Sequence, residues 1–304
     1  MKALVFGGAG FLGSHVADAL VQAGHDVTVF DKERSPFILP QQKMIVGDIL
    51  DEHAVSACVK GQDIVYNFAG IADIDEAAAH PLEAVKSNIL GNALILEACR
   101  AARVKRFIFA SSLYVYGKSG SFYRSTKLAS ELLIENYNEV YGLPFTILRY
   151  GSLYGPRSGS TNAINRFIAQ ALKDGKIVRH GDGDELREYI HVLDAAKGSV
   201  AILSEEFANQ NVMLAGQQQM RIRDLLTMIR EMFDGKIHIE YAPATESYHY
   251  EITPYVFAPR VAKRLVQTTY LDLGQGILDM IHGMAREADG AGRTKPGTGS
   301  KGQA

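Results

Sequence analysis

A glycine-rich turn near the start of the chain is the feature that most constrains the fold. The segment "VFGGAGFLGSHVADAL" places Gly7, Gly10 and Gly13 between a short apolar run and an amphipathic stretch. Glycines at this spacing let the backbone turn tightly and let a helix pack closely against a sheet. The N–H groups at the start of that helix then face an anion. The segment predicts a pyrophosphate-binding turn, although a merely tight turn would use similar residues.

Short apolar runs alternate with amphipathic stretches through the first half of the chain. The runs show little polar alternation, which is typical of parallel strands buried on both faces. We therefore expect an α/β fold with a Rossmann-like, doubly wound parallel sheet and right-handed crossovers. The predicted strands are 2–6, 26–30, 43–47, 63–69, 106–111 and 145–150, and the main predicted helices are 14–24, 87–102 and 125–142.

The pattern changes after "LYGPR" at 153–157. We assign 1–155 to a nucleotide-binding domain and 156–288 mainly to a smaller C-terminal α/β lobe for the substrate. Part of 186–216 is expected to return to the first sheet. The tail 289–304 is rich in Gly, Ser, Thr and Lys and has no apolar face, so we expect it to be disordered.

Composition excludes several classes of function. A formal net charge of −2 gives no basic footprint for nucleic acid or for an acidic membrane. No apolar run approaches the roughly 20 residues that a membrane span requires. Cys58 and Cys99 are the only cysteines, and we expect buried thiols rather than a disulfide or a metal site. We expect a soluble cytoplasmic protein that binds no metal.

Residues after the next strands bear on the choice of cofactor. Asp31 ends the second predicted strand, where a carboxylate accepts hydrogen bonds from an adenosine ribose and repels a 2′-phosphate. NAD is therefore favoured over NADP, although Lys32 and Arg34 offer positive charge nearby. Asp48 is expected either near the adenine or as a helix cap. The small residues of "NFAG" at 67–70 suit close cofactor approach or a tight turn.

The stretch "VYGKSGSFYRSTK" at 115–127 contains two tyrosines and a lysine of interest. Tyr123 and Lys127 are four positions apart, which puts both side chains on one face of a helix. In an isolated helix such a pair is usually structural. Tyr116 lies seven positions earlier. The residues alone do not decide whether Tyr123 and Lys127 form a catalytic pair or simply share a helix.

Several ordered motifs together make the sequence resemble a known family. From about residue 1 to about 285 the chain resembles the extended short-chain dehydrogenases/reductases, in the NAD-dependent epimerase/dehydratase group that acts on nucleotide sugars. The motifs are "GGAGFLGS", Asp31, "GDI", "NFAG", Asn88 in "SNILGN", "SSLYVYG", Tyr123-x-x-x-Lys127, "LRYGSLYGPR" and "GDGDELREYIHVLDAA".

The resemblance implies roles for individual residues. Tyr123 is expected to be the base, Lys127 to favour its phenolate together with the positive nicotinamide of NAD⁺, and Ser112 to hydrogen-bond the reacting hydroxyl. Ser111 is expected to be structural or cofactor-facing. The expected NAD contacts are Gly7, Gly10, Phe11, Leu12, Gly13, Asp31, Lys32, Asp48, Ile49, Phe68, Ala69, Gly70, Asn88, Ser111, Tyr123, Lys127 and Tyr150.

One segment narrows the expected reaction. Dehydratases and decarboxylases of the family usually carry carboxylates just after the Ser112 position, whereas this chain has Leu113 and Tyr114 there. The resemblance then implies a nucleotide-sugar 4-epimerase that forms a transient 4-keto sugar. The alternative is an NAD(P)H-dependent keto-sugar or small-carbonyl reductase. A third hypothesis is a cofactor-sensing or assembly protein that has lost its substrate.

The substrate end departs from the family pattern. Arg187 matches the arginine that contacts the nucleotide diphosphate, unless it is a surface residue paired with Glu185 or Glu188. Ser152 replaces a substrate-contacting asparagine, and the segment 117–122 is much shorter than usual. The family's Arg-x-Gly-Asp stretch is absent, which leaves Arg260 as a candidate second phosphate contact. Nearby aromatic residues are expected either to stack on the substrate or to form core: Tyr248, Tyr250, Tyr255 and Phe257.

The resemblance also implies a homodimer. The helices at 87–102 and 125–142 would pair with their symmetry mates in a four-helix bundle. Apolar residues on more than one face of the second helix are consistent with this: Leu128, Leu132, Ile134 and Tyr137.

Overall fold

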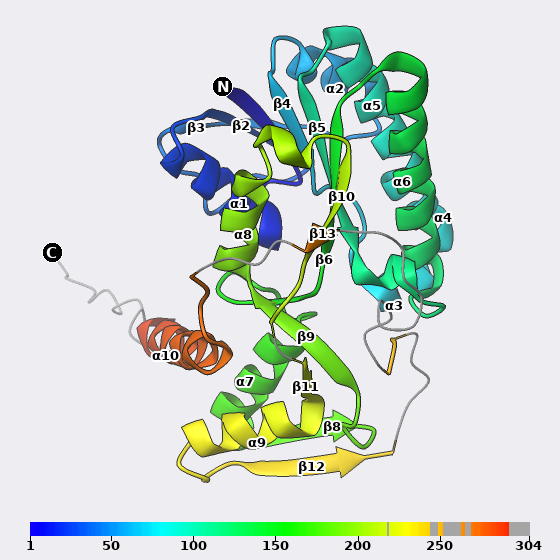
Figure 1. The fold of residues 1–304 in the computed structure, drawn as a ribbon. Helices are drawn as coiled ribbons and strands as arrows, with labels where there is room; N and C mark the ends of the chain where they lie inside the picture. Colours follow the sequence, from blue (N-terminus) through cyan, green and yellow to red (C-terminus); the bar gives the residue numbers. More distant parts are fainter. Residues whose placement is uncertain (218, 244–248, 252–262, 265–268, 292–304) are drawn as a thin grey trace, which may run out of the picture.

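The computed structural model describes residues 1–304 except 218, 244–248, 252–262, 265–268 and 292–304. The described residues form a larger lobe around a long parallel sheet and a smaller lobe at one end of that sheet (Figure 1). The N-terminus lies in the larger lobe, and the last helix lies beside the smaller one.

The described part of the large sheet has eight strands in the order β13-β10-β6-β5-β4-β1-β2-β3. Every neighbouring pair is parallel. The chain winds outward from β1 in one direction and then from β4 in the other, so the predicted doubly wound Rossmann-like fold is confirmed. The strands are β1 Lys2–Phe6, β2 Asp26–Asp31, β3 Gln42–Val46, β4 Ile64–Asn67, β5 Arg106–Ser112, β6 Phe145–Tyr150, β10 Gln210–Leu214 and β13 Lys263–Arg264.

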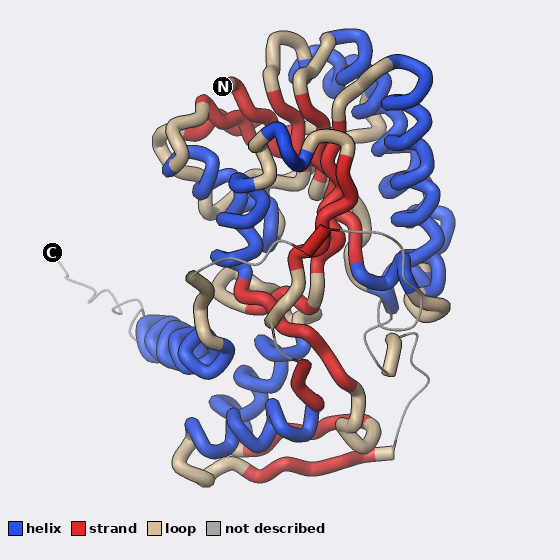
Figure 2. The backbone as a smooth tube through the Cα atoms, in the orientation of Figure 1, coloured by secondary structure: helices blue, strands red, loops and turns tan. Residues whose placement is uncertain are grey.

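Helices cover both faces of this sheet, which explains why its strands read as continuous apolar runs. Figure 2 shows the strands in red between layers of blue helices. Helices α1 (Phe11–Gln22) and α8 (Val192–Ala201) pack together on one face. Helices α2 (Glu52–Val59), α5 (Gly91–Ala102) and α6 (Ser121–Tyr141) cover the other. The four residues from Ala3 to Phe6 are consequently fully buried.

Several helices begin at other residues than the sequence predicted. Helix α6 begins at Ser121 rather than 125, because Gly120 adopts φ +104° and turns the chain into the helix without a capping side chain. Helix α1 begins at Phe11 rather than 14. A π-helical turn, η1 (Lys86–Leu90), precedes α5, and the short helices α3 (Ile74–Ala79) and α4 (Pro81–Val85) precede that turn.

The smaller lobe has its own apolar core between helices and short strands. It contains α7 (Ala163–Asp174), α9 (Ile222–Met232) and α10 (Leu273–Ala291), with the parallel pair β8 (Lys176–His180) and β12 (His238–Ala242). Three further strands, β7 (Ser152–Tyr154), β9 (Leu186–His191) and β11 (Gln219–Arg221), form a separate sheet, in which β9 runs from the junction of the lobes into the smaller lobe (Figure 1). Two 3₁₀ turns complete the described elements: η2 (Leu113–Tyr116) and η3 (Glu205–Phe207).

The end of the chain departs from the sequence prediction. Helix α10 includes residues 289–291, which the sequence assigned to the tail. The apolar residues Ile277, Met280 and Ile281 bury this helix against the smaller lobe. The segment 292–304 lies outside the described residues.

Both cysteines lie in the larger lobe. Cys58 and Cys99 are buried, unpaired thiols whose pKa values are raised by burial. In the part of the chain that the structure describes, no helix is both long enough and apolar enough to cross a membrane.

Candidate active site

The carboxyl ends of the central strands meet the smaller lobe, and the predicted site residues gather there. In open α/β sheets a ligand binds outside the carboxyl ends of the strands, where the strand order reverses. Here β1 and β4 are those neighbours. The glycine turn follows β1, "NFAG" extends from the end of β4, and Ser111 and Ser112 end β5.

The glycine turn brings α1 close to β1 and β4. A Cβ atom on Gly7 (φ +74°) would lie 2.5 Å from the backbone nitrogen of Ala69 and 2.6 Å from the carbonyl carbon of Phe68. A Cβ atom on Gly13 would lie 2.2 Å from the oxygen of Gly7. The first turn of α1 has no side-chain cap and no acidic residue, so its N–H groups suit a pyrophosphate. That turn opens with Phe11, Leu12 and Gly13 after Gly10.

Asp31 adjoins this turn at the end of β2. Its Oδ2 accepts a hydrogen bond of 2.9 Å from the backbone N–H of Ala9, while Lys32 is exposed. Asp48 accepts from the N–H of Leu50, and Asp51 caps α2 instead. The helix-cap alternative for Asp48 was therefore wrong, and its place near the adenine stays a prediction.

Three other predicted cofactor contacts have side chains engaged in the protein. Ile49 packs in the core, where a Cβ atom on Gly91 would meet it at 2.6 Å. The hydroxyl of Tyr150 lies 2.6 Å from Oγ of Ser199. Ser111 donates to the buried Glu131 at 2.5 Å, which agrees with the structural alternative. Each of these side chains thus has a structural contact within the protein, and its contact with the cofactor stays a prediction.

Asn88 joins the end of β4 to α6. Its Oδ1 accepts from the N–H of Ile71 at 2.8 Å, and its Nδ2 donates to Thr126 at 2.9 Å. Gly70 (φ +131°) passes so close that a Cβ atom would lie 2.3 Å from Oδ1 of Asn88. Asn88 thus holds the loop at Gly70 and Ile71 in place beside the site. It does so from the π-helical turn η1, which the sequence did not predict.

Tyr123 and Lys127 lie in the first turns of α6 and are both buried. The Nζ atom of Lys127 donates to the carbonyl of Ala110 at 2.8 Å and lies 5.8 Å from the centre of the Tyr123 ring. Ser112 ends β5 and forms a hydrogen bond with Tyr123. The structure therefore brings the three predicted catalytic residues together.

Burial is the largest cause of the pKa shifts of Tyr123 and Lys127. It raises the pKa of Tyr123 to about 12, against a smaller opposite effect of the Ser112 hydrogen bond. Burial lowers the pKa of Lys127 to about 8, while the charge of Glu131 acts to raise it. The protein alone thus keeps Tyr123 neutral at pH 7. The expected phenolate needs additional positive charge, which oxidised NAD carries.

Tyr116, the other tyrosine of the 115–127 stretch, has a structural partner. The hydroxyl of Tyr116 accepts a hydrogen bond of 3.0 Å from Nη1 of Arg149. Arg149 forms a two-pronged, fully buried ion pair with Glu131, at 2.7 Å and 3.0 Å. The sequence did not predict this ion pair, because its partners lie on separate elements, Glu131 on α6 and Arg149 on β6.

Arg187 lies on β9 at the predicted substrate end. It is 8% exposed, and its guanidinium carbon lies 4.3 Å from the centre of the Tyr250 ring. Glu185 pairs with Arg179, so the alternative of an Arg187–Glu185 surface pair was wrong. Ser152 begins β7 and is half-buried. Arg260 lies outside the described residues, as do Tyr248, Tyr255 and Phe257.

Tyr114 is a functional candidate that the sequence did not indicate, because it stood out there only as a position at which related enzymes carry a carboxylate. Its ring packs edge-on against Tyr123, with centroids 6.1 Å apart, and its hydroxyl lies 2.6 Å from Nδ1 of His249. A Cβ atom on Gly120 would lie 2.7 Å from the Tyr114 ring. The short 117–122 connection therefore packs directly on Tyr114. The sequence feature that could have indicated a role for Tyr114 is a bulky aromatic residue two positions after Ser112.

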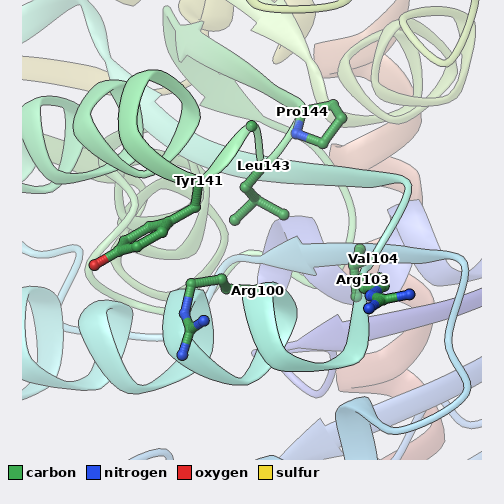
Figure 3. Close-up of a pocket in the computed structure, with 7 residues that line it drawn as sticks. Arg100, Arg103, Val104, Tyr141, Leu143 and Pro144 are labelled. Atoms are coloured by element: carbon green, nitrogen blue, oxygen red, sulfur yellow. The ribbon is translucent and has the colours of Figure 1, made fainter.

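A separate hollow lies at the opposite end of the sheet. Figure 3 shows it between the ends of α5 and α6, where the chain enters β5 and β6 at their amino ends. It is therefore remote from the catalytic residues. Its lining includes Arg100, Arg103, Val104, Tyr141, Leu143 and Pro144.

Comparison with known proteins agrees with this geometry. The model of the NAD-dependent epimerase/dehydratase family matches residues 3–216. A UDP-N-acetyl-alpha-D-glucosaminuronate decarboxylase of Bacillus cytotoxicus is 29% identical over 81% of this chain and 85% of its own. The crystal structure of a UDP-glucuronic acid 4-epimerase from Bacillus cereus, in complex with UDP-glucuronic acid and NAD, has a TM-score of 0.80 and 26% identity over 93% of this chain and 100% of its own.

A UDP-glucose 4-epimerase from Thermotoga maritima shares the fold, with a TM-score of 0.82 and 24% identity over 95% of this chain and all of the other. The family match covers the glycine turn, the three predicted catalytic residues and Arg187 in one continuous segment. The chain therefore belongs to the NAD-dependent epimerase/dehydratase family of the extended short-chain dehydrogenases/reductases, and its cofactor is NAD.

Proposed function

We propose that the chain is an NAD-dependent nucleotide-sugar epimerase. It oxidises the C4 hydroxyl of the sugar to a transient 4-keto intermediate and returns the hydride to the opposite face. The convergence of Ser112, Tyr123 and Lys127 at the cofactor edge of the sheet carries this proposal. NAD supplies the reversible hydride transfer, and the protein supplies the proton transfer and the binding.

Each catalytic residue has a task that its position supports. Tyr123 removes the proton from the C4 hydroxyl and later returns it. Ser112, which forms a hydrogen bond with Tyr123, is placed to hold the C4 hydroxyl beside it. Lys127 keeps a positive charge near the phenol ring, which favours the phenolate. Arg187 binds the diphosphate at the other end of the substrate, where a planar guanidinium suits two phosphate oxygens.

The residues after Ser112 favour epimerisation over the other reactions of the family. Dehydration and decarboxylation require further proton transfers at neighbouring carbons. Leu113 is buried and apolar, and burial raises the pKa of Tyr114 well above its usual range. Neither side chain provides a carboxylate there, in spite of the relationship to a decarboxylase.

The first test is conversion of nucleotide sugars by the purified chain. UDP-glucose, UDP-N-acetylglucosamine and UDP-glucuronic acid are suitable probes, with products resolved by NMR and without added NADH. We expect redox-neutral formation of a 4-epimer from at least one probe, and Tyr123→Phe to reduce its rate by at least about 100-fold. Conversion by the Phe variant at the wild-type rate would contradict the role of Tyr123.

Two other outcomes separate the alternatives. Steady oxidation of NADH with a keto-sugar or small carbonyl substrate, without epimer formation, would identify the reductase. Cofactor binding without turnover of any probe would favour a sensing or assembly role.

We also propose that the enzyme is a homodimer through α5 and α6. Leu132 on α6 is 58% exposed, and Leu90 beside the start of α5 is 50% exposed. Large apolar side chains this exposed are suited to burial by a symmetry mate. Ile134, by contrast, is buried within the protomer, so it does not contribute to that face as the sequence suggested.

A further inference from the structure

The side chain of Tyr250 lies between two functional parts of the site. Its ring faces the Arg187 guanidinium at 4.3 Å and the Tyr114 ring at 4.5 Å, with an interplanar angle of 47° to Tyr114. Tyr250 is 6% exposed, and Tyr114 in turn packs edge-on against Tyr123. One continuous series of ring contacts therefore links Arg187 to the catalytic tyrosine.

This stacking leaves the hydrogen-bonding edge of Arg187 usable. A guanidinium on an aromatic face keeps its N–H donors in its own plane, where they point past the rim of the ring. One of these, on Nη1, donates to the carbonyl of Leu186 at 3.0 Å. The ring and this carbonyl together restrict the rotamers of a long side chain that would otherwise lose considerable entropy on binding a ligand.

A hydrogen bond across the two lobes holds Tyr250 in turn. His249, its neighbour in the chain, places Nδ1 2.6 Å from the hydroxyl of Tyr114 in the larger lobe. This contact and the Tyr114–Tyr250 ring contact hold both residues against η2. The position of Tyr250 is thus set by the same residue that packs on Tyr123.

We propose that Tyr250 is a positioning residue that preorganises Arg187 for the diphosphate of the substrate, with the Tyr114–His249 hydrogen bond holding Tyr250 in place. The inference rests on the proposed function, because it takes Arg187 as the diphosphate ligand. It adds that the aromatic face, rather than the hydroxyl of Tyr250, does the positioning. A phenyl ring should therefore replace it.

UDP without a sugar is the probe, titrated calorimetrically into the full-length, NAD-loaded protein. We expect Tyr250→Leu to weaken UDP binding about fivefold to tenfold through the lost cation–π contact. Tyr250→Phe should restore affinity to within about twofold of wild type. In an Arg187→Ala background Tyr250→Leu should have no further effect, because the two residues act as one unit. Tyr241→Leu, at an exposed tyrosine on β12, is the matched control.

The outcomes separate this inference from the proposed function. Unchanged UDP affinity in Tyr250→Leu, or an equal loss with and without Arg187, overturns the positioning role alone. Failure of Tyr250→Phe to restore binding also overturns it, since the hydroxyl would then matter. A wild-type protein that epimerises a nucleotide sugar but binds no UDP would overturn the positioning role, while the proposed function would stand. A protein with neither activity contradicts both proposals. NAD content and the thermal midpoint of each variant establish that it is folded.

Discussion

Lys127 is a buried cation, and burial of its charge lowers the free energy of unfolding. Burial lowers its pKa from 10.5 to about 8, so the folded state binds fewer protons than the unfolded state between these values. Stability of the wild type must then rise with pH across this window. At 1.36 kcal/mol per pKa unit, the change is roughly 3 kcal/mol.

We predict that Lys127→Met abolishes this pH dependence as well as activity. Urea unfolding of NAD-free protein at pH 7.5 and 10.5 measures it for both proteins. The wild type should gain roughly 3 kcal/mol relative to the variant at the higher pH. Parallel pH profiles for the two proteins would mean that Lys127 is as well solvated in the folded state as in the unfolded state.

The Glu131–Arg149 ion pair should be the most sensitive polar contact near the site. Both side chains are 3% exposed, and removing one partner leaves the other as an unpaired buried charge. We expect Glu131→Gln to reduce the free energy of unfolding by about 3 kcal/mol in a denaturant titration. Glu139→Gln, at an exposed position on the same helix, should change it by less than about 0.5 kcal/mol. Equal effects would show that the pair contributes no specific stabilisation.

At the scale of elements, the glycine turn determines how closely α1 approaches the sheet, and a substitution in the turn tests whether NAD binding needs that approach. Gly13→Ala would place a methyl group 2.2 Å from the oxygen of Gly7 and force the turn to move. We expect at least a tenfold loss of NAD affinity, because the N–H groups that we expect to face the pyrophosphate move with the turn. Equilibrium dialysis with NAD measures this.

The control for that change is another helical glycine. Gly283→Ala in α10 adds its methyl group where no atom lies within 4 Å. It should leave NAD affinity unchanged and stabilise the helix by as much as about 1 kcal/mol. A similar NAD affinity in the Gly13 and Gly283 variants would mean that the turn tolerates the displacement.

Local pattern explains which elements the sequence predicted. The buried strands and the glycine turn follow from short-range hydrophobicity and spacing, and both are found in the structure. The start of α6 was wrong because Gly120 and its packing on Tyr114 set it, rather than a capping side chain. The π-helical turn at Lys86–Leu90 carries no composition signal, yet it places Asn88 against Gly70.

At the scale of the whole molecule, contacts between distant segments decide what the sequence could not predict. The proximity of Ser112, Tyr123 and Lys127 was predictable because they belong to one β5–α6 unit and to two neighbouring family motifs. The Tyr114–His249 and Arg187–Tyr250 contacts join segments that are far apart in the sequence. Their pairing depends on the tertiary fold, so no spacing rule in the sequence indicates it.

The proposed dimer gives the last prediction. A charge at Leu132 would be exposed in the monomer but buried at an interface formed by α6 and its symmetry mate, where an unpaired carboxylate is strongly unfavourable. We expect light scattering after size exclusion to give a dimer for the wild type and a monomer for Leu132→Glu. Leu172→Glu, on α7 in the smaller lobe, is partly exposed and should remain dimeric. A dimeric Leu132 variant would place the interface elsewhere, and a monomeric wild type would exclude the dimer altogether.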